Sequence, residues 1–170
     1  MSTTETQAAE KEATTAANVR DIPSMLLPVH EKQLLLPGVS VAEIVNYSAP
    51  ERAANAPAWL LGSIQWRRIS VPLLSFELLN NQAAIDDDEV PRIAVLNNTG
   101  LDEKVPFLAI LLQGIPRLLR VLPQDLTEVT NIELGAAEMA AMNIVATGET
   151  VLIPDISVLE QAYSEYLRTA

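Results

Sequence analysis

Hydrophobic residues along this chain fall into short runs separated by turn-forming residues, a pattern typical of β proteins. The runs lie at residues 25–29, 33–36, 39–45, 92–96, 106–112 and 115–122. Their short lengths and regular spacing favour small barrels over a doubly wound sheet. The first three runs predict a meander of strands, and the last three predict a second set.

The stretch 55–77 holds both tryptophans and is the part of the chain richest in turn signals. Pro57 suits the first position of a short helical turn, and Gly62 would end that turn before a strand begins. The hydrophobic residues then move from even to odd positions after Arg67 and Arg68. Because such a change of phase needs a turn or a bulge, it predicts a hairpin whose turn is Arg67-Arg68.

The C-terminal end predicts one amphipathic helix over residues 156–168. Ser157 and Glu160 have the spacing of a capping box, and hydrophobic residues recur at i, i+4 in two adjacent rows. The tyrosines of this helix are expected to belong to the core rather than to a site. The Ala-rich segment 134–142 before it fits either a helical turn or a covering loop.

Composition limits the classes of protein that the chain can form. With 170 residues, 49% of them hydrophobic, it can build one domain or two small subdomains with a common core. Its 22 acidic and 11 basic residues give a net charge near -11, which repels phosphate backbones and anionic lipid. Nucleic acid is therefore not expected as a partner, and no direct membrane insertion is expected.

Signals for export are not seen in the sequence. The first residues contain neither a basic region nor an apolar run, and the longest apolar run, 107–112, is far shorter than the roughly 20 residues of a membrane helix. The chain has no cysteine, so disulfides and thiolate metal sites are excluded, in agreement with a reducing compartment. The expected location is the cytoplasm.

Two segments are too polar to form a core. Residues 1–20 predict a disordered tail, which leaves 21–170 as the folded domain. The acidic run 86–89 could suggest a metal site, but consecutive residues alternate in direction and the spacing of a calcium loop is absent. A solvated loop is the favoured interpretation of that run.

The side chains needed for most catalytic sites are scarce. His30 is the sole histidine and is expected in an exposed turn, and the sequence contains no nucleotide-binding or nucleophile motif. No cofactor and no metal are predicted. Two carboxylates suffice for some hydrolyses, so a small carboxylate-dependent hydrolase stays open as an alternative, although no pair of acids can be assigned to it.

The central stretch resembles the signature of the CheW-like family of chemotaxis coupling proteins. Pro57, Trp59, Gly62, Arg67 and Pro72 match that signature in order and spacing. The resemblance implies a mainly β fold of two small five-stranded SH3-like barrels with a shared core. A short helix before the central hairpin and the C-terminal helix complete the expected fold.

Two positions depart from the family pattern. Arg68 stands where the family usually has Gly, and Ser75 where it usually has Asp. A residue other than Gly at positive φ costs about 1 kcal/mol, so the turn is either slightly strained or of another type. The form Trp-Arg-Arg followed by Ser-Phe-Glu is similar to coupling proteins of type IV pilus chemosensory systems, which control twitching motility.

The resemblance also implies partners and a binding surface. It implies a non-catalytic scaffold that couples a chemoreceptor signalling tip to the regulatory domain of a CheA-type histidine kinase. Val41, Glu43 and Arg67 match family positions that face the receptor. Two simpler interpretations stay open: Glu43 is only a solvated strand residue, or Arg67 only pairs with a carboxylate such as Glu43 and holds the hairpin in place.

Overall fold

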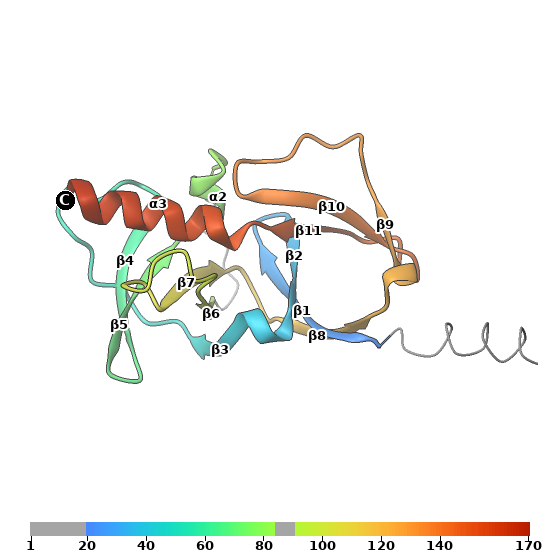
Figure 1. The fold of residues 1–170 in the computed structure, drawn as a ribbon, viewed down its shortest axis with the longest axis horizontal. Helices are drawn as coiled ribbons and strands as arrows, with labels where there is room; N and C mark the ends of the chain where they lie inside the picture. Colours follow the sequence, from blue (N-terminus) through green and yellow to red (C-terminus); the bar gives the residue numbers. More distant parts are fainter. Residues whose placement is uncertain (1–19, 84–90) are drawn as a thin grey trace, which may run out of the picture.

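The computed structural model describes residues 20–83 and 91–170, which form two β sheets and a C-terminal helix (Figure 1). The first sheet has six strands in the order β8-β1-β2-β11-β10-β9. Its strands are β1 (Ile22–Val29), β2 (Lys32–Pro37), β8 (Arg117–Val121), β9 (Leu126–Glu128), β10 (Glu138–Ile144) and β11 (Thr150–Pro154). Residues 1–19 of the predicted tail and the acidic run 86–89 lie outside the described residues.

The second sheet has five strands in the order β3-β6-β7-β5-β4. Its strands are β3 (Val41–Asn46), β4 (Leu60–Trp66), β5 (Ile69–Leu74), β6 (Arg92–Asn97) and β7 (Phe107–Leu112). Three short helical segments connect strands, namely η1 (Gly38–Ser40), α2 (Phe76–Leu79) and η2 (Pro123–Asp125), and α3 (Ile156–Thr169) follows β11.

The mainly β class, the two sheets and the C-terminal helix are confirmed. The first sheet has one strand more than expected, because the three residues of β9 add to its edge by pairing with β10. The Ala-rich segment resolves into a loop and the start of β10, because Ala140 and Ala141 pair with β11.

The predicted short helix before the central hairpin is wrong. The Pro57 carbonyl accepts a hydrogen bond from the Leu60 amide at 3.0 Å, but that single turn ends at once because Leu60 is already the first residue of β4. Gly62 therefore does not end a turn. It lies inside β4, where the register with β5 shifts between Leu60 and Gly62.

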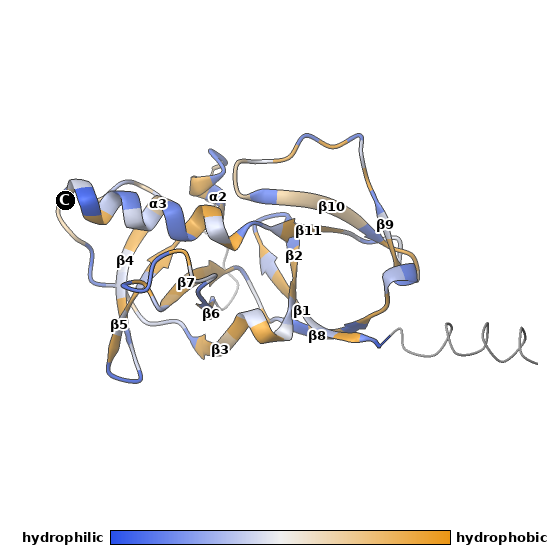
Figure 2. Ribbon diagram, viewed as in Figure 1, coloured by the Kyte–Doolittle hydropathy of each residue, from blue (hydrophilic) through white to orange (hydrophobic). Residues whose placement is uncertain are grey.

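The predicted hairpin is confirmed. Trp66 pairs with Ile69, so Arg67 and Arg68 are the two residues of its turn. Figure 2 shows this turn as a hydrophilic tip beyond strands that carry hydrophobic residues. Two-residue hairpin turns favour positive φ at both positions, and Arg67 and Arg68 adopt φ of 47° and 66°.

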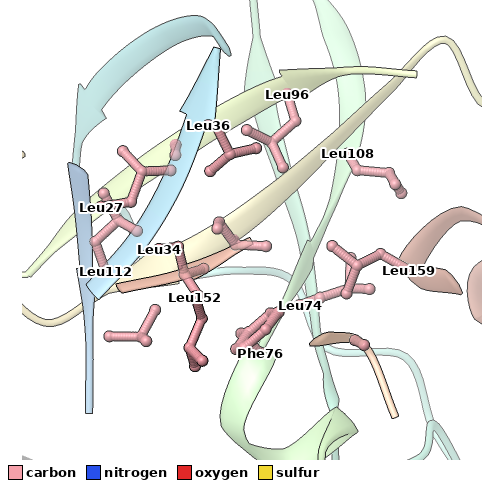
Figure 3. Close-up of a cluster of buried hydrophobic side chains, with 14 of the residues drawn as sticks. Leu27, Leu34, Leu36, Leu74, Phe76, Leu96, Leu108, Leu112, Leu152 and Leu159 are labelled. Carbon is pink, nitrogen blue, oxygen red and sulfur yellow. The ribbon is translucent and has the colours of Figure 1, made fainter. Parts of the chain in front are cut away.

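The two sheets share a core, as expected. Leu27 and Leu34 from the first sheet, Leu96 and Leu108 from the second, and Leu159 of α3 belong to one cluster of buried side chains (Figure 3). We call this cluster the main core. Replacing one such leucine by alanine typically costs about 2–5 kcal/mol, so neither sheet can be treated as a separate folding unit.

Each sheet also has a smaller cluster of its own. In the second sheet, Ile64, Trp66, Val71 and Val95 belong to a cluster that is distinct from the main core. We call it the barrel core. Its existence means that both faces of the second sheet bury hydrophobic side chains.

The helix α3 begins two residues earlier than a Ser157 cap would place it. Asp155 is the N-cap, and its side chain accepts a hydrogen bond from the Ser157 amide at 3.0 Å. The predicted capping box of Ser157 and Glu160 is therefore wrong. Within the described ranges, no helix is long and apolar enough to cross a membrane.

The Glu160 side chain is fully buried and connects α3 to the loop between β6 and β7. Its carboxylate accepts hydrogen bonds from the Thr99 hydroxyl at 2.6 Å, the Thr99 amide at 2.9 Å and the Asp102 amide at 2.8 Å. Because α3 follows the first sheet and this loop belongs to the second, Glu160 helps fix the two halves of the domain relative to each other.

Candidate functional site

Glu43 and Arg67 lie together, although they are far apart in the sequence. One guanidinium nitrogen of Arg67 is 3.0 Å from Oε2 of Glu43, and their side chains are 67% and 40% exposed. The ion pair between Arg67 and Glu43, which the sequence analysis left open, is therefore present. Because both side chains also face solvent, the pair is accessible to a partner.

Trp66 is the residue that places this pair. Its indole Nε1 donates a hydrogen bond to Oε2 of Glu43 at 2.8 Å. The Arg67 guanidinium carbon lies 4.7 Å from the centroid of the same ring, a distance at which a cation is attracted to the ring face. Glu43, Trp66 and Arg67 thus form one connected group, which we call the charged triad.

The triad rests on a rigid base. The Trp66 ring is buried and meets the Phe107 ring edge-on, with centroids 4.9 Å apart. Edge-on aromatic pairs contribute about 0.5–1.5 kcal/mol beyond their buried area. The predicted hairpin contains Trp66, but the sequence does not indicate this role, because the hydrogen bond to Glu43 joins residues 23 positions apart.

The third predicted receptor-facing residue, Val41, is not part of the triad. A bulge between Val41 and Glu43 pairs Val41 with Leu96 and Glu43 with Val95. Leu96 belongs to the main core and Val95 to the barrel core, so the bulge turns the two β3 side chains toward opposite faces. Val41 is half-buried and packs against the main core.

Gly62 and Pro72 of the family motif have structural roles. Gly62 has a φ of 142°, and a Cβ atom there would lie 2.5 Å from the Glu51 carbonyl oxygen, so only glycine fits. Pro72 is buried in β5, and the pairing of β5 with β7 begins one residue later, at Leu73. A residue without an amide hydrogen can occupy that position because β7 makes no ladder contact there.

The other two motif residues, Pro57 and Trp59, lie in the loop before β4. Both are half-buried, and Trp59 packs against the main core. The Trp59 carbonyl accepts a hydrogen bond from the Ser75 amide at 2.8 Å, which ties the loop to the end of β5.

Ser75 explains how the chain departs from the family's Asp without losing the local structure. Its hydroxyl accepts a hydrogen bond from the Leu78 amide at 3.2 Å and caps α2, a role that Ser and Asp perform about equally well. The same hydroxyl donates to Oε2 of Glu77 at 2.8 Å, and both side chains are buried. A carboxylate at position 75 could not donate this bond.

His30 is half-buried rather than exposed, which corrects the prediction for the sole histidine. Its side chain is 17% exposed, and its backbone amide donates to Oε1 of Glu77 at 3.0 Å. Glu138 is paired with Lys32 at 2.8 Å. Across residues 20–83 and 91–170, no three His, Cys, Asp or Glu side chains lie close enough to hold a metal ion.

The fold and the exposed Glu43–Arg67 pair define a class of protein: a two-sheet β domain that presents a fixed pair of charges on its surface. The family model for the CheW-like domain matches residues 23–162. The chain therefore belongs to the CheW-like family, a family of non-catalytic chemotaxis scaffolds that couple chemoreceptors to CheA. This membership decides against the carboxylate-dependent hydrolase.

The chain is also similar to a solved structure of this family. The scaffolding protein TtCheW from Thermoanaerobacter tengcongensis superposes with a TM-score of 0.66 at 11% sequence identity. The alignment covers 79% of this chain and 88% of that chain, so the two share the fold over most of their lengths. No curated protein matches the sequence.

Proposed function

We propose that the charged triad is the surface through which this scaffold binds the signalling tip of a chemoreceptor in the cytoplasm. The regulatory domain of a CheA-type histidine kinase then binds elsewhere on the same domain. The observation that carries this proposal is the exposed Glu43–Arg67 pair held at 3.0 Å beside the Trp66 ring.

The physical argument for this surface is preorganisation. Two long charged side chains normally lose rotamer freedom when a partner fixes them, at a cost of about 0.5–1.5 kcal/mol each. Trp66 holds Glu43 by a hydrogen bond and lies against Arg67, so part of this ordering exists before binding. Charges fixed at a surface set orientation and partner choice more than bulk affinity. The family match also assigns Val41 to the receptor-facing surface, and it stays in the proposal on that ground alone, because its side chain turns to the face of β3 opposite to Glu43.

The variant Arg67→Glu tests this role. It should leave the free energy of unfolding within about 1 kcal/mol, the ceiling for an exposed ion pair, but abolish binding to a receptor cytoplasmic fragment. Binding to the kinase regulatory domain should persist. Both affinities are measured by isothermal titration calorimetry with fragments from the native host.

Arg120→Glu is the matched control. Arg120 pairs with Asp21 at 3.0 Å, and those side chains are 72% and 41% exposed, close to the values of the triad pair. The same charge reversal there, on the other sheet, should leave receptor binding unchanged. Equal loss in both variants would mean that net charge, and not the triad, controls binding.

We further propose that the chain serves a type IV pilus chemosensory system that controls twitching motility. The form Trp66-Arg67-Arg68 followed by Ser75, Phe76 and Glu77 supports this narrower assignment. Affinity purification from the native host should co-elute the receptor and kinase of that system, and deleting the gene should alter twitching. Co-elution with the flagellar system alone would contradict the assignment.

A further inference from the structure

A groove runs between the C-terminal half of α3 and the loop before β4. It has a volume of about 680 Å³, and its walls include Pro57 and Trp59 on one side and Ala162 and Tyr166 on the other. Figure 1 shows this loop passing beside the end of α3. The volume is in the range of pockets that hold a ligand or a few side chains of a partner.

A second hollow adjoins the first at Tyr166. It has a volume of about 240 Å³, is lined by Glu51, Tyr163 and Tyr166, and shares Tyr166 with the larger space. The Tyr163 and Tyr166 rings stack with centroids 6.2 Å apart and an angle of 29° between their planes. We call the two hollows together the tyrosine groove.

The walls combine aromatic rings with negative charge. Of the residues that line the groove, the charged ones, Glu51 and Glu165, are both acidic. Neither carboxylate forms an ion pair within 4.0 Å with a basic side chain of the described residues. The Glu165 carboxylate accepts one hydrogen bond, from the side-chain Nε2 of Gln161 at 2.9 Å. Both acids therefore remain available to a cation.

The larger hollow is separate from the charged triad. Trp59 and Pro57 precede the first residue of β4, whereas Trp66 ends that strand and Arg67 follows it. At about 3.3 Å per residue, the two ends of this strand are roughly 20 Å apart. A ligand in the larger hollow would leave Glu43 and Arg67 exposed.

We propose that the tyrosine groove binds a peptide segment of a partner protein that carries an Arg or Lys side chain between apolar residues. The cation would lie against the face of Tyr166 and pair with Glu165 or Glu51, since aromatic faces and carboxylates both attract cations. Apolar neighbours of the cation would cover Trp59 and Pro57. This site goes beyond receptor coupling through the triad, and its failure would leave that function untouched.

The test uses two short probes and the full-length protein. Acetyl-Leu-Arg-Leu-amide should shift the NMR signals of the Trp59 indole and the Tyr166 amide saturably, with a Kd in the millimolar range. Acetyl-Leu-Glu-Leu-amide should not. Raising the ionic strength should weaken binding of the first probe, because exposed charge pairs are screened by salt. Shifts that are absent, or that scatter over the surface, would overturn the proposal.

Variants locate the site. Glu165→Lys should raise the Kd of the Arg probe at least tenfold, and Glu165→Gln, a milder change, should raise it severalfold. Glu133→Lys is the matched control, since Glu133 is an exposed acid in the loop before β10 and does not line the groove. An equal loss in Glu133→Lys would show that net charge alone attracts the probe. Concentration-dependent shifts at the groove without probe would assign it to a second copy of the chain and overturn the proposal.

Discussion

Glu43 and Trp66 connect the two edges of the five-stranded sheet. Glu43 belongs to β3, the first strand in the sheet order, and Trp66 to β4, the last. The 2.8 Å hydrogen bond between the indole and the carboxylate therefore joins strands that share no backbone ladder. The sheet must curl for this contact to form, so one side-chain bond both joins the two edges of the curled sheet and sets the position of the charged pair.

Trp66→Phe should weaken this closure without removing the ring. The hydrogen bond from the indole to the carboxylate is lost, which should cost about 1–2 kcal/mol because hydrogen bonds to charged groups are stronger than neutral ones. Urea denaturation measures the change. Trp59→Phe is the control, because the Trp59 ring packs on the main core and away from the triad. Equal losses would show that ring size, and not the bond to Glu43, matters.

Arg68→Gly should stabilise the protein. The φ of 66° at Arg68 costs about 1 kcal/mol for a residue with a Cβ atom, and the greater freedom of glycine in the unfolded chain offsets part of the gain. A net gain of about 0.5 kcal/mol in the free energy of unfolding is expected. Arg67→Gly should give no gain, because it also removes the ion pair with Glu43. Destabilisation by Arg68→Gly would mean that Arg68 makes an additional stabilising contact.

Ser75→Asp should restore the family's residue and nevertheless destabilise this chain. It would place a second buried carboxylate against Glu77, whose Oε2 lies 2.8 Å from the present hydroxyl. We expect a loss of about 2 kcal/mol at neutral pH, since a buried charge loses its donor and gains a repulsive neighbour. The double variant Ser75→Asp/Glu77→Gln should recover most of the loss. Failure to recover would show that the cap itself, and not the paired charges, is the cause.

Because of Glu160, the free energy of unfolding should decrease at acidic pH. Burial tends to raise the pKa of Glu160, but the hydrogen bonds from Thr99 and Asp102 outweigh it and lower the pKa below its ordinary value of 4.5. A carboxyl with a lowered folded pKa contributes stability above its unfolded pKa, and this contribution is lost as the pH falls through the folded pKa. Glu160→Gln should therefore be less stable than the wild type at pH 7, with a gap that narrows below about pH 4.5.

The comparison with Glu160→Gln is needed because the pKa of a second carboxyl, that of Asp102, is also lowered. The Lys104 amide donates a hydrogen bond to Asp102, and this bond lowers the pKa of the Asp102 carboxyl. Both proteins keep Asp102, so the difference between them isolates Glu160. Thermal unfolding over pH 3 to 7 measures it, and a gap that is independent of pH would contradict the assignment.

Local features of the fold could be predicted from the sequence. The strand runs, the two-residue turn at Arg67 and Arg68, and the C-terminal helix each follow from patterns within a few residues of each other. The family resemblance supplied the pairing of two sheets around one core. The bulge at Val41 and Glu43 was not predictable, because it depends on how β3 aligns with β6, and β6 lies about 50 residues later.

The same limit applies to the side chains that hold the domain together. Ser157 and Glu160 have capping-box spacing, but the Glu160 carboxylate has donors in a loop 58 and 61 residues away. The sequence shows Ser75 only as a departure from the family pattern, because its bond to Glu77 depends on the burial of both side chains in the fold. Spacing along the chain cannot distinguish a local partner from a distant one that the fold brings closer.

A charge swap within the triad tests the central claim most directly. The double variant Glu43→Arg/Arg67→Glu can form the same ion pair with the charges exchanged. Its loss in the free energy of unfolding should therefore be smaller than the sum of the losses in the two single variants. If the pair is the receptor-docking surface, the swapped protein should still fail to bind the receptor fragment while binding the kinase regulatory domain with unchanged Kd. Recovery of receptor binding in the swap would contradict the account, because it would mean that the pair serves only to hold the hairpin against β3.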